Sequence, residues 1–204
     1  PDGARLLLPA TPSVELHLAA HEETLTANGT FVIPRPRLWS TASPSLYEVR
    51  AAIHSDNCEG PEVDDASSTI GIRSLRYDAD MGFALNGNFM KLRGFCDHDS
   101  FAVVGMAVPE RINLFRAQAL RARGGSRRRM SHNPPDVASL DIRGRPGAAV
   151  IDDNRLFGIR SAYAEAFASL VRRDRNHPSV VLWSFCNEMG CEAWHELGGP
   201  RFQK

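Results

Sequence analysis

The Asn187-Glu188 pair combines residue types and a position that could carry chemistry. It follows Val180-Val-Leu-Trp-Ser-Phe185, an apolar run with the length and composition of a fully buried strand. In a barrel of parallel strands, side chains at the carboxyl ends of the strands form the active site. A glutamic acid there, partly removed from water, keeps its proton to higher pH and can protonate a leaving oxygen. The alternative is that Glu188 caps the following turn or pairs with an arginine.

The second half of the chain has the pattern of elements that would position such a pair. Beyond about residue 80, short apolar stretches ending in polar residues alternate with longer helical segments, which is typical of β/α units around a parallel sheet. A second helix is predicted over 161–173, ahead of a polar stop and the strand at 180–185. The first is predicted over 109–121, and its apolar face comprises Ile112, Phe115, Ala119 and Leu120.

The first half has the pattern of antiparallel strands. Residues 13–18 and 47–53 alternate polar and apolar side chains between turn-forming residues, and no helical period appears before about residue 108. A β-sandwich portion is therefore predicted over 1–78, and a second domain over 79–204. Asn86-Gly87 predicts a hairpin at the entrance to that second domain.

The composition argues against several classes of function. Lysine plus arginine and aspartate plus glutamate number 24 each, so no strong field draws the 204 residues to nucleic acid or an anionic membrane. No apolar run reaches the ~18 residues that span a bilayer, and the start at Pro1 suggests a mature product, a trimmed chain or a fragment. Free, mostly buried thiols are predicted from the spacing of Cys58, Cys96, Cys186 and Cys191. Free thiols weakly favour a cytoplasmic location.

The stretch Arg121-Ala-Arg-Gly-Gly-Ser-Arg-Arg-Arg129 allows a second interpretation. Five arginines in nine residues, with glycines between them, resemble an arginine-rich binder of single-stranded nucleic acid. Such binders also carry aromatic side chains on which bases stack, and this stretch has none. Nucleic-acid binding is therefore the weaker alternative.

The run from Arg173 to Glu188, Arg-Asp-Arg-Asn-His-Pro-Ser-Val-Val-Leu-Trp-Ser-Phe-Cys-Asn-Glu, resembles the acid/base signature of glycoside hydrolase family 2. Upstream, residues 36–47 are similar to the strand motif of the family's sandwich domain, and residues 71–76 and 82–94 resemble the approach to its barrel. The matches stand in family order. The resemblance implies an internal piece of a β-galactosidase-type enzyme: the end of an immunoglobulin-like β-sandwich, then the N-terminal half of a TIM (β/α)8 barrel.

On that template, polar groups follow four successive strands. The resemblance makes Glu188 the proton donor and Asn187 a sugar ligand, and it places the histidines in the sugar pocket. Imidazoles suit that work because they hydrogen-bond hydroxyls and present a flat apolar face; a structural role is their alternative. The predicted substrate-binding residues, in strand order, are His98, Arg129, His132, Asp153 and Asn187.

The resemblance also implies that a catalytic group is missing. Retaining hydrolysis needs two carboxyl groups about 5–5.5 Å apart. The family's nucleophile comes from a strand near the seventh, whereas this chain ends around the helix after the fourth. Glu192 and Glu196 match no nucleophile motif. Little or no turnover is therefore expected from these residues alone.

The expected function of the parent enzyme is hydrolysis of terminal non-reducing β-D-galactose residues in β-galactosides, with retention. Ser131-His-Asn-Pro-Pro135 favours a galactosidase over a glucuronidase. A β-glucuronidase and a non-catalytic or incomplete fragment remain alternatives. The expected partner is the carbohydrate, without nucleic acid or membrane, and the full-length parent could form a homo-oligomer.

Several positions depart from the family pattern. Arg127 and Arg128 stand where the second strand has small or apolar side chains, so two unpaired guanidiniums would be buried unless both reach solvent. Residues 141–147 place Gly and Pro inside an expected helix. There a Gly would destabilise the helix by about 1 kcal/mol and a Pro by about 3 kcal/mol. Asp153 replaces the usual Glu and is one methylene shorter. The metal motif of some relatives is not visible in 152–158, so no ligand is assigned, although the resemblance leaves room for a divalent cation such as Mg²⁺.

Overall fold

The computed structural model describes residues 30, 32–55, 60–144, 147–155 and 160–187. The chain divides into two compact units, one of Pro1–Arg37 and Val49–Ser68 and the other of Leu38–Glu48 and Thr69–Lys204. The predicted strand at 13–18 lies outside the described residues, and so does Glu188. The domain boundary after residue 78 stays a prediction.

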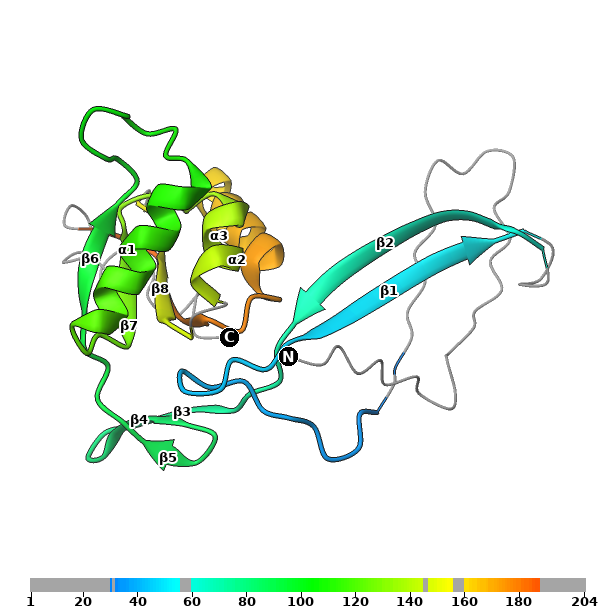
Figure 1. The fold of residues 1–204 in the computed structure, drawn as a ribbon, viewed down its shortest axis with the longest axis horizontal. Coiled ribbons are helices and arrows are strands. Elements are labelled where there is room, and N and C mark those ends of the chain that lie inside the picture. The colour runs from blue at the N-terminus through cyan, green and yellow to red at the C-terminus, as the bar shows by residue number, and fades with distance from the viewer. Residues whose placement is uncertain (1–29, 31, 56–59, 145–146, 156–159, 188–204) are drawn as a thin grey trace. The chain divides into compact units, whose positions relative to one another are not determined.

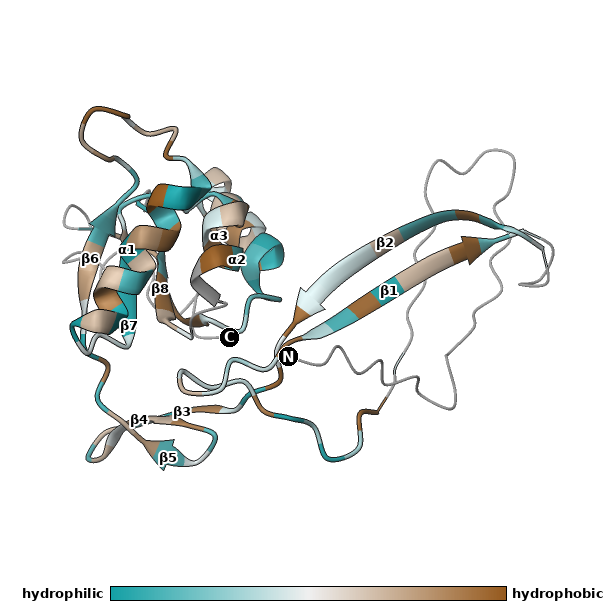
Figure 2. Ribbon diagram, in the orientation of Figure 1, coloured by the Kyte–Doolittle hydropathy of each residue, from teal (hydrophilic) through white to brown (hydrophobic). Residues whose placement is uncertain are grey.

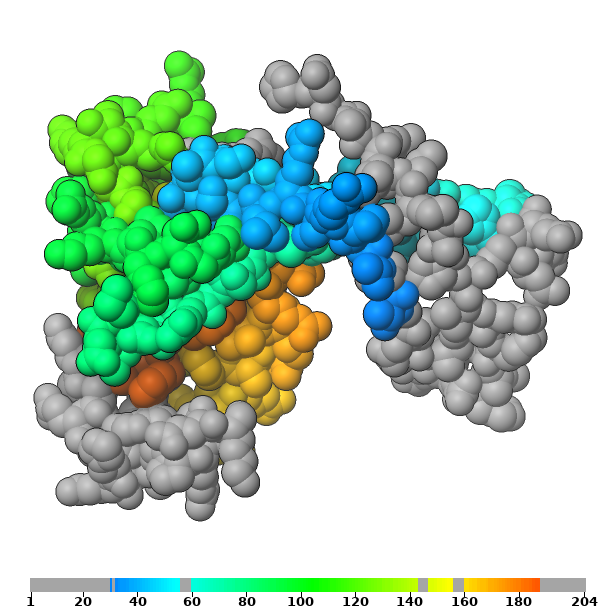
Figure 3. Space-filling view, turned by 90° about the horizontal axis from the view of Figure 1, so that it is seen from below, coloured from blue at the N-terminus to red at the C-terminus, as the bar shows by residue number. Residues whose placement is uncertain are grey.

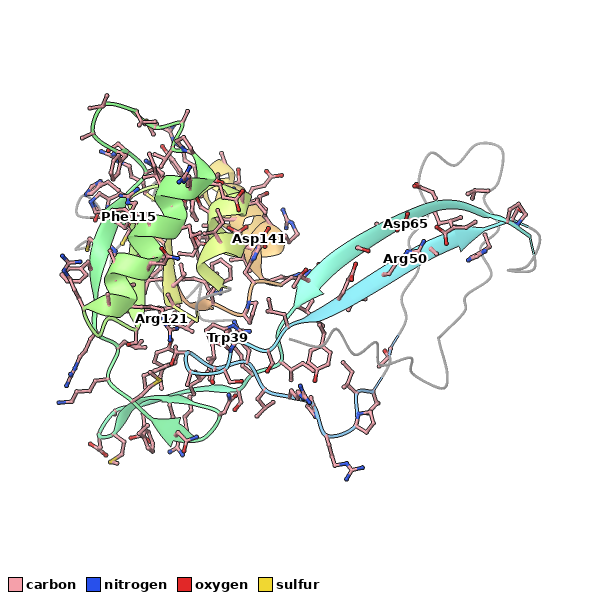
Figure 4. All side chains as sticks on the ribbon, viewed as in Figure 1. Trp39, Arg50, Asp65, Phe115, Arg121 and Asp141 are labelled. Carbon is pink, nitrogen blue, oxygen red and sulfur yellow. The ribbon has the colours of Figure 1, made fainter. Side chains whose placement is uncertain are left out.

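Two long strands, β1 (Tyr47–His54) and β2 (Glu62–Ile70), form most of the described part of the first unit (Figure 1). β1 covers the strand predicted over 47–53. The side chains of both strands are almost all exposed. Arg50 Nε donates a hydrogen bond across the pair to Asp65 Oδ2 at 2.9 Å (Figure 4). An ion pair this exposed contributes little to stability.

The second unit begins with a small antiparallel sheet, ordered β3-β4-β5, of β3 (Leu75–Asp78), β4 (Gly82–Leu85) and β5 (Asn88–Phe89). Asn86 and Gly87 connect the last two strands with φ angles of 51° and 80°. Positive φ at both central residues is what a two-residue type I′ turn requires, and Asn-Gly supplies it at least cost. The predicted hairpin is confirmed.

A four-stranded parallel sheet follows, in the order β6-β7-β8-β9. Each connection runs through a helix, so all four strands end at the same edge (Figure 1). This arrangement confirms the predicted fold, an antiparallel β region followed by the first β/α units of a TIM barrel. The elements are β6 (Gly94–His98), α1 (Glu110–Ala122), β7 (Arg127–Ser131), α2 (Val137–Gly144), β8 (Ala149–Asp153), α3 (Ser161–Asp174) and β9 (Val180–Ser184).

Trp39 lies at the centre of the first core cluster, with 0% of its surface exposed. It packs with Phe83 and Leu85 of β4, with Ala149, the first residue of β8, and with Val181, the second residue of β9. The main-chain N–H of Trp39 donates to the Ile72 carbonyl at 2.8 Å, and the Trp39 carbonyl accepts a hydrogen bond from Asn86 Nδ2 at 2.9 Å. A segment before the small sheet therefore completes the core of the second unit.

The small sheet and the residues just before it pack against the beginning of β9. Figure 3 shows the teal and green residues of β3–β5 beside the dark orange residues of that strand. Two side chains make the contact specific, because Arg73 Nη2 and Tyr77 Oη donate to the main-chain oxygens of Val180 and Val181. The beginning of β9 is thereby fixed from the side of the small sheet.

The second core cluster lies between the parallel sheet and its helices. Met130, Val150 and Val180 point from three neighbouring strands toward Leu140 of α2, and all four side chains are at most 2% exposed. In Figure 2 the first part of β8 is brown, the colour of apolar residues. Strand side chains alternate between faces, so the residues next to these in sequence face the other side of the sheet.

The two helices predicted at 109–121 and 161–173 are confirmed within one or two residues, and the predicted face of α1 is right for Leu120 but wrong for Phe115. Asn113, Ala117 and Leu120 are its buried residues, whereas Phe115 is 59% exposed (Figure 4). Asn113 occupies the buried face because its Nδ2 donates to Ser139 Oγ on α2 at 2.9 Å. A polar side chain with a buried partner costs little there.

α2 ends at Gly144, before the Pro-Gly of residues 146–147. Pro146 lies outside the described residues, so its expected cost stays a prediction. The prediction of free, mostly buried thiols is wrong in two respects, since Cys96 is free but exposed and Cys186 is disulfide-bonded.

Arg128 was predicted either to be buried without a partner or to reach solvent, and both alternatives are wrong. Its side chain is 6% exposed and lies 2.8 Å from Asp97 Oδ2, through Nη1. Asp97, itself 9% exposed at the side chain, also pairs with Arg116 of α1. One buried carboxylate of β6 thus compensates the guanidinium on β7 and joins both strands to the first helix.

Candidate active site

The carboxyl ends of β6 to β9 bring together five of the six predicted site residues. Arg129 lies two residues before the end of β7, and its register partner on β8 is Ile151. Asp153 ends β8, and Asn187 follows β9. Because Arg129, Ile151 and Asp153 alternate with the residues of the second core cluster, they face the side of the sheet away from the helices.

One guanidinium nitrogen links three of these residues. Arg129 Nη2 donates to Asp153 Oδ2 at 2.8 Å and to Asn187 Oδ1 at 3.0 Å. The same carboxylate oxygen lies 3.2 Å from His132 Nδ1. The four side chains form one continuous hydrogen-bonded chain, here called the strand-end network: Asn187, Arg129, Asp153 and His132.

His98 joins the strand-end network through a ring contact. Its imidazole lies edge-on to that of His132, with ring centroids 5.0 Å apart and an interplanar angle of 87°. The main-chain oxygen of His98 accepts a hydrogen bond from Arg116 Nη2 at 2.7 Å. The helix α1 therefore holds the end of β6 in place beside the network.

The strand-end network is buried at its centre and open at its ends. The Asp153 side chain is 0% exposed, while those of Arg129 and His132 are 24% and 22% exposed. The Asp153 charge is balanced by Arg129, so the described part of the network has no uncompensated charge when His132 is neutral. Buried charges persist in this way when they are paired and hydrogen-bonded.

Asp152, adjacent to Asp153, belongs to a different environment. Its carboxyl group is fully buried and faces Asp174 at the end of α3. Burial first, and then the hydrogen bond and negative charge of Asp174, raise the pKa of Asp152 to about 8, against a smaller opposing effect of Arg173. Arg173 in turn binds Asp174 through Nε and Nη2, at 2.7 and 2.6 Å. Asp152 thus holds a proton at neutral pH.

The sequence interpretation assigned a role to Asp153 but did not identify the pairing of Asp152 with Asp174. Strand alternation was the signal that could have separated Asp152 from Asp153. Among the described residues, no group of three His, Cys, Asp or Glu side chains could hold a metal ion. In the same part of the chain, no helix is long and apolar enough to cross a membrane.

Two family models match the chain. Residues 9–73 match "Glycosyl hydrolases family 2", and residues 158–197 match "Glycosyl hydrolases family 2, TIM barrel domain". The second match contains the Asn187-Glu188 pair. Both parts of the chain belong to glycoside hydrolase family 2.

Individual relatives carry two kinds of activity in their names. The chain is 33% identical over 177 residues to Beta-galactosidase BoGH2A of Bacteroides ovatus, covering 80% of this chain and 20% of that protein. It is 26% identical over 203 residues to a beta-glucuronidase of Bacteroides fragilis, covering 92% and 28%. A solved family 2 structure from Bacteroides cellulosilyticus has a TM-score of 0.71 at 36% identity, covering 81% and 23%.

These relatives confirm the family but do not separate β-galactosidase from β-glucuronidase. The chain spans between a fifth and just over a quarter of the length of the two curated relatives. The roles of the six predicted site residues stay predictions, and Glu188 lies outside the described residues.

Proposed function

We propose that the parent protein hydrolyses terminal non-reducing β-D-galactose residues in β-galactosides with retention of configuration, with Glu188 as the proton donor. The observation that carries the proposal is the strand-end network. Its four side chains converge at the carboxyl edge of the parallel sheet, and Asn187 immediately precedes Glu188. Catalytic groups of parallel barrels occupy this edge.

In the proposed reaction Glu188 protonates the glycosidic oxygen as the bond to the anomeric carbon breaks, and later takes a proton from the water that releases the sugar. A carboxylate nucleophile must attack from the other side. Asp153 is unsuited to that role, because it is fully buried and its Oδ2 already accepts hydrogen bonds from Arg129 and His132. We expect the nucleophile from a segment outside this chain.

One sequence feature favours a galactoside over a glucuronide. The motif Ser131-His-Asn-Pro-Pro135 resembles that of the galactosidase branch of the family. Arg129 does not decide between the two substrates, because it binds Asp153 and Asn187 through Nη2 and a guanidinium has further N–H donors.

Two other functions have less support. An incomplete, non-catalytic piece is expected to unfold with low cooperativity, because the free sheet edges of four β/α units are exposed. Nucleic-acid binding through residues 121–129 would need accessible arginines. Arg128 is instead buried against Asp97, and Arg129 belongs to the strand-end network.

The test compares four proteins: this chain, the chain extended through the rest of its reading frame, and Glu188→Gln in each. Hydrolysis of a chromogenic β-galactoside and of the matching β-glucuronide is measured for all four. Glu192→Gln in the extended protein is the matched control, because Glu192 lies four residues on and matches no catalytic motif.

The proposal predicts that only the extended protein hydrolyses the galactoside. In that protein, Glu188→Gln should lower the rate of hydrolysis by about 10²–10⁴-fold, whereas Glu192→Gln should leave it unchanged. Hydrolysis of the glucuronide alone would replace the proposal by a β-glucuronidase. Turnover by the short chain would show that the nucleophile has been wrongly placed outside it. Inactivity of the extended protein on both substrates would leave a non-catalytic role.

A further inference from the structure

Asp153 is the only member of the strand-end network whose side chain is completely buried. Its Oδ2 is shared by Arg129 Nη2 at 2.8 Å and His132 Nδ1 at 3.2 Å. A carboxylate oxygen can only accept hydrogen bonds. The other oxygen, Oδ1, is buried. A sugar hydroxyl would have to displace one of two donors to reach Oδ2, or disturb the packing around Oδ1, so direct sugar binding is a poor description of what Asp153 does.

The consequence for His132 is a fixed tautomer. Because Asp153 Oδ2 accepts, Nδ1 of the imidazole must carry the hydrogen. In the neutral ring, Nε2 then has the lone pair and accepts. His132 is 22% exposed, with His98 packed edge-on at 5.0 Å, so its ring orientation is held on two sides.

The consequence for Asn187 runs through Arg129. Arg129 Nη2, held by Asp153, donates to Asn187 Oδ1 at 3.0 Å. An amide whose oxygen is occupied in this way presents its Nδ2 hydrogens to other partners. The buried carboxylate thereby sets one acceptor, His132 Nε2, and one donor, Asn187 Nδ2, on opposite ends of a single network.

We infer that Asp153 is a positioning residue, not a sugar ligand, and that it selects neutral hydroxyl-bearing sugars by fixing His132 as an acceptor and Asn187 as a donor. The inference rests on the proposed function and names its substrate class. A hydroxyl both donates and accepts, whereas a carboxylate only accepts. A carboxylate placed at His132 Nε2 meets a lone pair and is rejected, since a polar site left unpaired discriminates strongly.

The first measurement is made on this full chain and needs no activity. The ring nitrogens of ¹⁵N-labelled histidine are observed by long-range proton–nitrogen NMR above the titration range of histidine, and His132→Gln identifies the signal. We expect a protonated Nδ1 and an unprotonated Nε2 for His132. The opposite tautomer in the unaltered chain overturns the inference without any variant of Asp153.

Three variants separate positioning from general damage. Asp153→Asn removes the committed acceptor and is expected to make His132 a mixture of tautomers, whereas Asp153→Glu keeps a carboxylate and restores Nδ1–H. Asp152→Asn is the matched control, because it changes the adjacent buried aspartate on the same strand, whose carboxyl group faces Asp174. An equal effect of Asp152→Asn on His132 would assign the result to disturbance of β8 and overturn the inference.

The second measurement uses the extended protein. Asp153→Asn is expected to lower kcat/KM for a β-galactoside by about 10–100-fold, as loss of the partner that orients a histidine does elsewhere, and to narrow the preference for the galactoside over the glucuronide. A change in rate with unchanged preference would contradict the assignment of specificity. If the unaltered extended protein hydrolyses neither substrate, the proposed function fails, while the tautomer measurement still decides whether Asp153 positions His132.

Discussion

Asp152 and Asp153 are neighbours on β8, yet their carboxyl groups serve opposite sides of the sheet. Asp153 binds Arg129 and His132 at the strand ends, whereas Asp152 meets Asp174 beside the helices. Strand geometry alone produces the separation, because successive side chains alternate. One residue type thus supplies a charged anchor at one position and a proton-holding group at the next.

The proton on Asp152 predicts a pH-dependent stability. The pKa of its carboxyl group rises from 3.8 to about 8 on folding, so the folded chain binds this proton more tightly than the unfolded chain. The resulting stabilisation is complete below the unfolded pKa and is lost as the pH rises through the folded pKa. Asp152→Asn carries no charge and keeps a hydrogen for Asp174, so it is expected to unfold less readily than the unaltered chain at alkaline pH.

Urea unfolding at several pH values checks this expectation. The gain in free energy of unfolding should be about 1–3 kcal/mol above the folded pKa and should shrink towards acid pH. Asp80→Asn, at an exposed aspartate, should change little at any pH. A gain from Asp152→Asn that is the same at acid and alkaline pH would rule out the proton linkage.

Loss of Arg129 should affect stability as well as sugar binding. Arg129→Met leaves the buried Asp153 carboxylate with the His132 donor alone and releases Asn187 Oδ1. An unsatisfied buried acceptor costs about 1–3 kcal/mol. Thermal unfolding of the chain measures the loss, with Arg111→Met as the exposed control on α1. Equal stability of the two variants would mean that water replaces the arginine at Asp153.

The buried ion pair between β6 and β7 should show energetic coupling. Asp97 and Arg128 have side chains 9% and 6% exposed and lie 2.8 Å apart, and Arg116 is a second partner of the carboxylate. A double-mutant cycle of Asp97→Asn and Arg128→Met should give a coupling energy above about 1 kcal/mol. Additive effects of the two substitutions would show that Arg116 alone compensates Asp97.

Trp39→Ala should be among the most destabilising single changes in the second unit. The indole is fully buried among Phe83, Leu85, Ala149 and Val181, and truncation of a buried tryptophan costs about 3–5 kcal/mol. Leu38→Ala, at a side chain 43% exposed, is the neighbouring control and should cost below about 0.5 kcal/mol. Chemical denaturation of both variants tests the difference, and similar losses would refute the packing role.

Much of the fold could be predicted because its signals are local. Asn86-Gly87 specifies a turn within two residues, and helical periodicity located α1 and α3. The convergence of Arg129, Asp153 and Asn187 was expected from the resemblance to the family, and it agrees with the rule that consecutive parallel strands end at one edge. The turn and the helices needed only neighbours in the chain, whereas the site residues needed the family template.

The misses have tertiary causes. Asn113 was not expected on the buried face of α1, because its partner Ser139 lies on the next helix. Arg128 was expected to be unpaired or exposed, because nothing near it in sequence identifies Asp97 as its counter-ion. Polar residues become acceptable in a core only when a distant partner arrives, and hydrophobic periodicity carries no information about that partner.

The sequential order of β6 to β9 also bears on synthesis of the protein at the ribosome. Chains emerge from the amino terminus and fold in that direction. Arg129 on β7 leaves the ribosome before Asp153 on β8, and Asn187 follows β9. The Arg129 guanidinium is therefore hydrated until both of its acceptors, Asp153 and Asn187, have been synthesised. The strand-end network is complete only when Asn187, after the fourth strand, has been translated. A nascent chain arrested before β8 carries both histidines without the Asp153 carboxylate that binds His132.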